Sequence, residues 1–200
     1  MPKTFSESER TYIKERLMEE AKKSLTLYGI RKTTVDDLVK RVNIPKGTFY
    51  LFYDSKERLI FDVILQFNDE TQQKLIAEVS TLKDDIDHEK LTDIVFGLYK
   101  TLDDSFMPKL IADGELEFYM KRLPPELSQT HAEHDDLMVE ELVSLLPDMK
   151  VEDAKVFSAA LRGIFLSLLH KQDIGEEVFD EALRVMIRGV VIQMFEGDKK

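Results

Sequence analysis

The stretch TTVDDLVKRVNIPKGTFYLFYDSKERL, residues 33–59, decides the fold of this 200-residue chain. Thr34, followed three residues later by an acidic side chain, is a helix-start signal, and apolar residues then recur at helical spacing. Asn43 tolerates a left-handed backbone, and Pro45 suits the first position of a new helix. The pattern therefore predicts a short helix, a tight turn and a second short helix that ends near Phe52, which is a helix-turn-helix arrangement.

Helix signals also dominate on both sides of this stretch. A capping box that begins at Ser6 opens a helix, and Gly29 is suited to end it. No strand pattern or internal repeat is evident, so the sequence predicts an all-α protein, with a three-helix head over 1–55 and a larger helical body over 56–200. Besides the helices over 6–28, 34–42 and 45–52, we expect helices near 54–78, 89–106, 109–122, 125–146, 152–171 and 176–195.

Composition excludes several classes of protein. The chain has no cysteine, which excludes disulfides, a thiolate nucleophile and a cysteine zinc site. No apolar run approaches the roughly 20 residues that a membrane span needs, and the charged start does not look like a signal peptide. We therefore expect a cytoplasmic protein.

Charge is divided unevenly along the chain. The net charge is −11, but the residues up to Leu59 hold 13 lysines and arginines against 9 acidic residues, a net of +4, and the remainder carries −15. A basic head on an acidic body is a hint of nucleic-acid binding.

The second short helix has side chains that suit DNA recognition. Lys46 and Tyr50 lie four residues apart and share one helix face, where an ammonium and a hydroxyl can reach bases or phosphates. Gly47 and Thr48 are small enough to allow close approach of the backbone, and Thr48 adds a hydroxyl. Phe49 falls on the opposite side and is expected to pack on the preceding helix.

Two further residues extend this predicted surface. Phe52 offers an apolar face for a thymine methyl group, and Lys56, in the first turn of the next helix, can reach a phosphate. Spacing alone leaves an alternative open, namely a tight helical turn with surface lysines over an aromatic core.

The same stretch closely resembles the signature of the TetR family of bacterial transcriptional regulators. The resemblance covers the first third of the chain and is carried by the following elements: Thr34, Lys46-Gly47-Thr48-Phe49-Tyr50, Phe52-Tyr53, Ser55-Lys56-Glu57 and Leu59.

The resemblance implies a homodimer whose two heads bind successive major grooves of a near-palindromic operator. By position, it implies contacts with bases or backbone for Lys46, Gly47, Thr48, Tyr50 and Phe52, phosphate contacts for Thr34 and Lys56, and a core place for Phe49. The sequence departs from the family pattern at Val42, Asn43, Pro45 and the Phe52-Tyr53 pair. These departures leave the operator sequence open.

The last two predicted helices favour dimerisation. Their apolar residues cover a wide arc, so each helix must be buried on more than one side, and Ala159 and Gly163 would permit close approach of a second chain. A central helix of a monomeric bundle is the alternative. The residues expected at the interface are Phe157, Leu161, Ile164, Leu168, Met186, Val190 and Met194.

Family members commonly place a ligand cavity in the body, and aromatic residues near its centre supply apolar walls. The candidates are Phe96, Tyr99, Phe106, Phe118 and Tyr119, although aromatics at helical spacing also form ordinary cores. Asp113, Glu115 and Glu117 border an apolar run, where they could attract a cationic ligand or lie solvated on the surface.

No catalytic or metal site is expected. His131 and His134 lack the third ligand of known zinc helices, no phosphate-binding glycine loop is present, and no cofactor is implied. The sequence therefore predicts a ligand-responsive DNA-binding regulator, with a repressor favoured over an activator. The alternative is a helical small-molecule carrier or scaffold that does not bind DNA.

Overall fold

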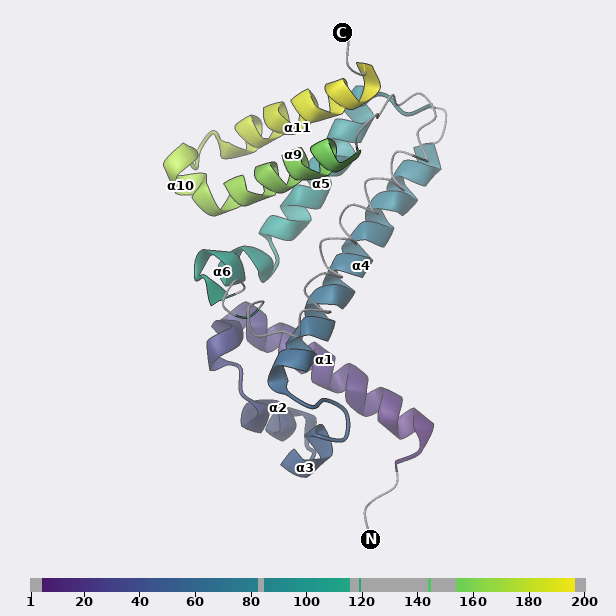
Figure 1. Cartoon of the computed structure of the whole chain (residues 1–200), viewed down its shortest axis with the longest axis vertical. Coiled ribbons are helices and arrows are strands. Elements are labelled where there is room, and N and C mark those ends of the chain that lie inside the picture. Colours follow the sequence, from purple (N-terminus) through teal and green to yellow (C-terminus); the bar gives the residue numbers. More distant parts are fainter. Residues whose placement is uncertain (1–4, 83–84, 116–118, 120–143, 145–153, 197–200) are drawn as a thin grey trace. The chain divides into compact units, whose positions relative to one another are not determined.

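The computed structural model describes residues 5–82, 85–115, 119, 144 and 154–196. All elements assigned in these ranges are helical, which confirms the all-α prediction (Figure 1). The chain divides into two compact units. The first unit, called the head below, comprises Met1–Asn68 with Lys109–Leu123, and the second, called the body, comprises Asp69–Pro108 with Pro124–Lys200.

Helix α1, Glu7–Lys32, begins with the predicted capping box. The Ser6 hydroxyl accepts a hydrogen bond from the Glu9 amide at 3.3 Å, and the Glu9 carboxylate accepts one from the Ser6 amide at 2.8 Å. Apolar residues spaced four apart form its buried face, because every fourth residue lies on nearly the same side of a helix. They are Ile13, Leu17, Ala21 and Leu25.

Gly29 interrupts α1 but does not end it. Its backbone is left-handed, with φ 78° and ψ −177°, and helical geometry then resumes through Lys32. The predicted end of the helix at Tyr28 therefore lies four residues too early. The three residues after the break belong to the same helix assignment because the chain turns back into helical conformation at once.

The turn between the next two helices forms as the sequence indicates. Thr34 caps α2, Val35–Val42, by accepting a hydrogen bond from the Asp37 amide, and Asn43 takes the left-handed conformation with φ 60°. Helix α3, Lys46–Phe49, starts one residue after Pro45 and ends three residues before the predicted end. Amides of Leu51 and Phe52 bond three residues back, so the chain tightens into a turn there.

Helices α4, Lys56–Leu82, and α6, Met107–Ala112, each belong to both units. The first part of α4 contributes to the head a run of side chains exposed by 3% or less: Leu59, Ile60, Phe61, Val63 and Ile64. Helix α6 begins two residues before the helix predicted over 109–122 and ends at Ala112, and part of that predicted range lies outside the described residues. The boundary predicted at residue 55 remains a prediction, although contacts assign the start of α4 to the head.

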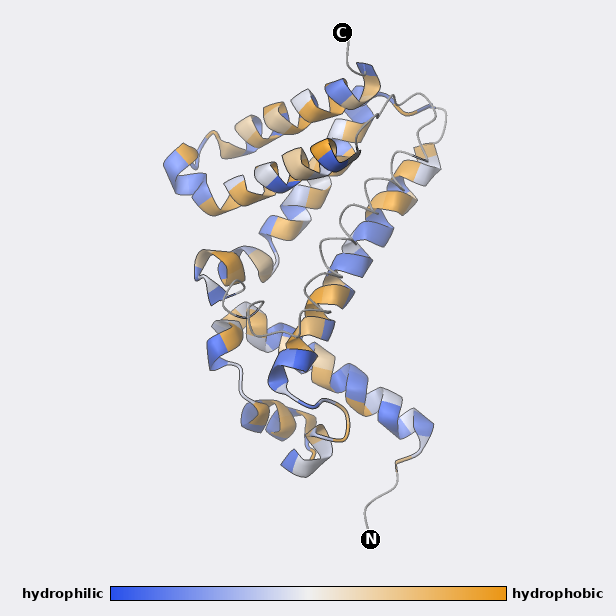
Figure 2. Ribbon diagram, in the orientation of Figure 1, coloured by the Kyte–Doolittle hydropathy of each residue, from blue (hydrophilic) through white to orange (hydrophobic). Residues whose placement is uncertain are grey.

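The body packs α5, His88–Asp103, against α9, Ala154–Ser167, and α11, Phe179–Glu196, with the end of α4 (Figure 1). Apolar residues recur along these helices in Figure 2. The predicted helix over 152–171 is divided, because a 3₁₀ turn over Leu168–His170 separates α9 from α10, Lys171–Ile174. The buried core consists of Leu75, Val79, Leu91, Val95, Tyr99, Ile164, Leu168, Phe179, Leu183, Ile187 and Val191.

Ion pairs link α5 and α11 beside this core. Acidic and basic residues four apart on α11 meet opposite charges on α5 in antiparallel order. The pairs are Asp180 with Lys100 at 2.9 Å, Arg184 with Asp93, and Arg188 with Glu89 at 2.6 Å. They fix which turn of one helix faces which turn of the other.

Two further predictions from the sequence concern the helix over 125–146 and the absence of a membrane span. The helix over 125–146, with His131 and His134, lies outside the described residues except for Ser144, which is helical. Among the helices that the structure does describe, none is both long enough and apolar enough to cross a membrane.

Candidate nucleic-acid interface

Lys46 lies at the start of α3 with its ammonium exposed and paired. Its Nζ contacts both carboxylate oxygens of Asp36 on α2, at 2.9 and 3.1 Å, and both side chains are more than half exposed. The carboxylate of Asp36 raises the pKa of Lys46, first through this hydrogen bond. A weak, solvent-screened pair of this kind can exchange Asp36 for a stronger acceptor at small cost.

Gly47 and Tyr50 stand on the same surface. A Cβ added to Gly47 would meet no atom within 4 Å, so folding does not require glycine there. Tyr50 is 49% exposed, and its ring packs edge-on against buried Phe49 at 5.3 Å. This contact fixes the Tyr50 ring while its surface stays available.

Leu51 belongs to this surface, although the sequence analysis did not single it out. It is 56% exposed, directly after Tyr50. The signal that could have found it is its position in the turn beyond α3, since the neighbouring Phe49 and Tyr53 already fill the core. An exposed leucine beside a tyrosine supplies apolar contact area for thymine methyl groups.

Thr48 and Phe52, two of the residues predicted to contact DNA, are less accessible than expected. Thr48 is 9% exposed, so its side chain mostly faces the head and does not present an open hydroxyl. Phe52 is half-buried between Phe5, with ring centres 6.2 Å apart, and the Arg10 guanidinium, 5.0 Å from its ring. The N-terminal end of α1 and the residue Phe5 before it therefore cover much of the Phe52 ring, which was expected to contact a thymine.

Lys56 also lies differently. Its Nζ donates a hydrogen bond to the backbone carbonyl of Ile30 at 3.0 Å, and the pair is partly buried. The lysine expected to contact phosphate thus holds the start of α4 to the end of α1. The sequence could not show this, because 26 residues separate the two groups.

Thr34 is exposed at the start of α2, where two acidic residues follow it. Its hydroxyl donates to the Asp37 carboxylate at 2.6 Å and accepts from the Asp37 amide at 3.2 Å. The helix N-terminus favours a phosphate, but the neighbouring carboxylates oppose one. Any phosphate contact at Thr34 must therefore involve the backbone amides as well as the hydroxyl.

A nearly buried carboxylate connects α1 to α2 behind this surface. Glu20 on α1 accepts from Lys23 at 2.8 Å, and Arg16 and Arg41 approach it at 3.6 and 3.8 Å. The hydrogen bond from Lys23, together with the nearby positive charges, lowers the pKa of Glu20 below its ordinary value of 4.5. Arg41 comes from α2, so this group helps to hold the recognition helices to α1.

Tyr53 closes the head core beside α3. It is 2% exposed, and its hydroxyl is the one buried side-chain polar atom without a hydrogen-bond partner among the described residues. Burial raises the pKa of Tyr53 strongly, so the phenol stays neutral. The second aromatic of the predicted pair is therefore a core residue.

The predicted pocket residues do not gather in one unit. Tyr99 is in the body core and donates to the Leu161 carbonyl at 2.6 Å, while Phe96 packs partly buried beside that core. Phe106 is buried in the body, and Tyr119 belongs to the head, where its hydroxyl donates to the Glu57 carbonyl. Phe118 lies outside the described residues.

The predicted dimer residues mostly face their own chain. Ile164, Leu168 and Met194 are 7%, 4% and 1% exposed, so they have no surface left to offer a second chain. Leu161, Met186 and Val190 pack partly buried against the core, and Phe157 is half-buried. The apolar residues that remain exposed on these helices are different ones, among them Val156, Leu166 and Val185.

A comparison with known proteins finds a family match within the head. Residues 17–63, from the middle of α1 into α4, match the model for bacterial regulatory proteins of the tetR family. This segment of the chain is similar to the TetR family. The match confirms the resemblance that the sequence shows over the same residues.

A curated relative supports the same assignment. The chain is 38% identical over 61 residues to the uncharacterized HTH-type transcriptional regulator YhgD of Bacillus subtilis. The match covers 30% of this chain and spans only about a third, 32%, of that relative's length.

Solved structures of transcriptional regulators share the fold over nearly the whole chain. A putative regulator from Mesorhizobium loti has a TM-score of 0.67 at 15% identity, covering 94% of this chain and 96% of that one. The regulator FadR from Bacillus subtilis, in complex with stearoyl-CoA, has a TM-score of 0.60 at 15% identity, covering 92% and 98%.

Proposed function

We propose that this protein is a homodimeric DNA-binding transcriptional repressor of the TetR family, which releases a near-palindromic operator when a small molecule binds to its body. The observation that carries the proposal is the exposed surface of Lys46, Gly47 and Tyr50, which lie along and directly after a helix held in helix-turn-helix geometry.

The head has the chemistry for reading a major groove. Lys46 can exchange the Asp36 carboxylate for guanine or phosphate acceptors, and Tyr50 adds a hydroxyl on the same surface. The open space above Gly47 allows the start of α3 to approach the bases closely. Thr34 adds a phosphate contact at the start of α2, whereas the bonded Lys56 and half-covered Phe52 contribute less than their positions alone suggest.

Dimerisation would use exposed residues of α9 and α11. On α9 an exposed line at helical spacing joins Val156, Ala159, Gly163 and Leu166, and a second on α11 joins Val185 and Gly189. The two helices contact each other. Small residues between larger apolar ones let a second helix pair approach closely, so we propose a second copy of this chain as the occupant.

The body would hold the ligand. FadR, which has the same fold, is described in complex with stearoyl-CoA, and that ligand belongs to FadR. For this chain we propose a small molecule bound beside the aromatic residues of the body, of which Phe96 and Phe106 remain candidates. Ligand binding lowers operator affinity if it favours a conformation that fits the operator poorly.

The test is selection of duplexes from random DNA by the full-length protein, followed by affinity measurements across a salt series. We expect a near-palindrome, a steep fall of affinity with salt, and weaker binding by Lys46→Ala and Tyr50→Phe. Enrichment of no sequence, with no binding at low salt, would contradict the regulator and favour the carrier.

A further inference from the structure

A carboxylate lies on the surface that we propose faces DNA. Asp36 is in the first turn of α2, and its side chain is 70% exposed. Both of its oxygens accept hydrogen bonds from the ammonium of Lys46 on α3, at 2.9 and 3.1 Å. Because DNA carries a dense row of negative phosphates, a carboxylate beside the recognition helix opposes binding to any duplex.

The fold of α2 does not explain this carboxylate. The helix start is capped by Thr34, whose hydroxyl accepts from the amide of Asp37 at 3.2 Å and donates to its carboxylate at 2.6 Å. Asp37 also places a negative charge near the positive helix N-terminus, which is favourable there. Within the described residues, the side chain of Asp36 forms hydrogen bonds only to Lys46. The cap of α2 therefore remains complete without the charge of Asp36.

The pairing changes what Lys46 can bind with profit. An unpaired lysine at the start of α3 would attract the phosphates of every sequence alike. The ion pair itself is weak in water, so breaking it costs little. The larger cost falls on the released carboxylate of Asp36, which loses its water against the DNA and is left without a donor. Close contact is therefore favourable only where the DNA offers acceptors to Lys46 and a donor to Asp36.

A G·C base pair presents this pattern in the major groove. Guanine offers two neighbouring acceptors, N7 and O6, and the amino group of cytosine lies next to them as a donor. An A·T pair also offers a donor, the adenine amino group, but that group separates the two acceptors from each other. Phosphates offer acceptors alone. An ammonium and a carboxylate held side by side on α3 and α2 thus match a G·C pair better than the other surfaces of DNA.

We propose that Asp36 is a specificity-determining residue, which accepts from the cytosine of a G·C pair while Lys46 binds the guanine, and which penalises contacts of Lys46 with phosphates. This inference rests on the proposed DNA-binding function. Asp36 lowers the affinity for DNA in general and raises the ratio between the affinities for the operator and for other sequences. That ratio decides operator occupancy, because a genome offers a large excess of competing sites.

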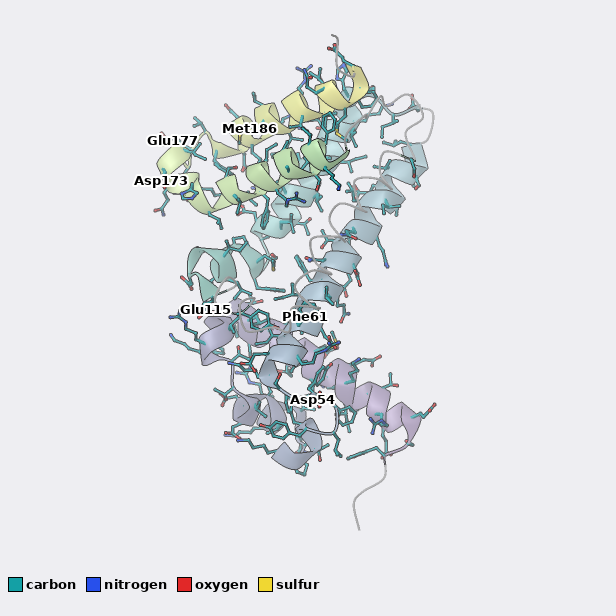
Figure 3. All side chains as sticks on the ribbon, in the orientation of Figure 1. Asp54, Phe61, Glu115, Asp173, Glu177 and Met186 are labelled. Atoms are coloured by element: carbon teal, nitrogen blue, oxygen red, sulfur yellow. The ribbon has the colours of Figure 1, made fainter. Side chains whose placement is uncertain are left out.

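The first test compares Asp36→Asn with Asp54→Asn in the full-length protein, on a scrambled duplex across a salt series. Asp54, labelled in Figure 3, is exposed between α3 and α4, and the bonds of Lys46 go to Asp36 instead. Each change removes one negative charge from the head, so both share its general effect on DNA affinity. Only Asp36→Asn should also free a lysine, which steepens the slope of log affinity against log salt by about one per head.

The second test replaces each base pair of the selected operator in turn. For the wild type, we expect one G·C pair in each half-site whose change to A·T weakens binding by roughly tenfold, a discrimination typical of a base pair read by two hydrogen bonds. Asp36→Asn should lose most of this preference and keep those at other positions. In a Lys46→Ala background, Asp36→Asn should do no more than Asp54→Asn does, because the two residues act as a pair.

These measurements distinguish the possible failures. Equal salt slopes and unchanged base preferences in Asp36→Asn and Asp54→Asn would mean that Asp36 is only a solvated carboxylate, and would overturn the proposal. Weaker binding of Asp36→Asn to every duplex would overturn it as well, because Asp36 would then support Lys46 rather than restrain it. If the wild type itself enriches no duplex and binds none at low salt, the proposed function fails first and the inference about Asp36 falls with it.

Discussion

The head and the body both have an apolar core, but they differ in the polar contacts that accompany it. In the head, helix ends are joined by side chains that bind backbone atoms, as Lys56 and Glu115 do at Ile30. In the body, α5, α9 and α11 share an apolar core flanked by ion pairs between side chains. Hydrogen bonds to backbone atoms are directional, whereas apolar burial is not. The directional bonds at the ends of α1 and α4 thus add to the apolar core that the head also has.

The largest expected effect on stability is in the body core. Leu183 on α11 is fully buried, so Leu183→Ala removes buried methyl groups and leaves a cavity. We expect a loss of about 2–5 kcal/mol in the free energy of unfolding, measured by urea denaturation. The control, Gln193→Ala on the exposed side of α11, should change little. Equal effects from both would show that the body is not held by this core.

A smaller effect is expected at the polar link between α1 and α2. Glu20→Gln removes a charge that Lys23 and Arg41 stabilise, and should cost on the order of 1 kcal/mol at neutral pH. Because the folded pKa of Glu20 lies below 4.5, its contribution is present above that pH and is lost as pH falls through the folded value. The stability gap between wild type and Glu20→Gln should therefore close on acidification. A gap independent of pH would contradict this assignment.

The smallest expected effect on folding accompanies a large one on DNA. Gly47→Ala adds a methyl group to α3 in open space, and alanine favours helix over glycine. We expect thermal stability to stay equal or to rise by up to about 1 kcal/mol. Operator affinity should fall, because the added methyl group separates α3 from the bases. Unchanged affinity would place the DNA on another surface.

Local backbone chemistry made the head predictable. The roles of Thr34, Asn43 and Gly29 follow from caps and left-handed turns, which depend only on neighbouring residues. The burial of Thr48 and the bonds of Lys56 and Glu115 depend on chain segments far away in sequence, so no spacing rule could reveal them.

The exposed side of the last helix could not be read from the sequence for another reason. Helix α11 is apolar on many sides, and sequence periodicity alone does not say which side faces the body core. Met194 is buried there, whereas Val185 is 71% exposed. Only the packing against α5 and α9 separates the inner residues from those free to meet a second chain.

The passage of α4 and α6 between the units has a consequence for modularity. A head cut at residue 55 would lose Leu59, Ile60 and Ile64, which complete its core, together with Lys109 and Glu115, which bond to backbone atoms of α1. If heads were exchanged between relatives at that point, the recognition helix of one protein would pack against the α4 residues of another. A working chimera must transplant two separate pieces together, residues 1–68 and 109–123. The residues that form the head are therefore encoded in two separate stretches of the gene.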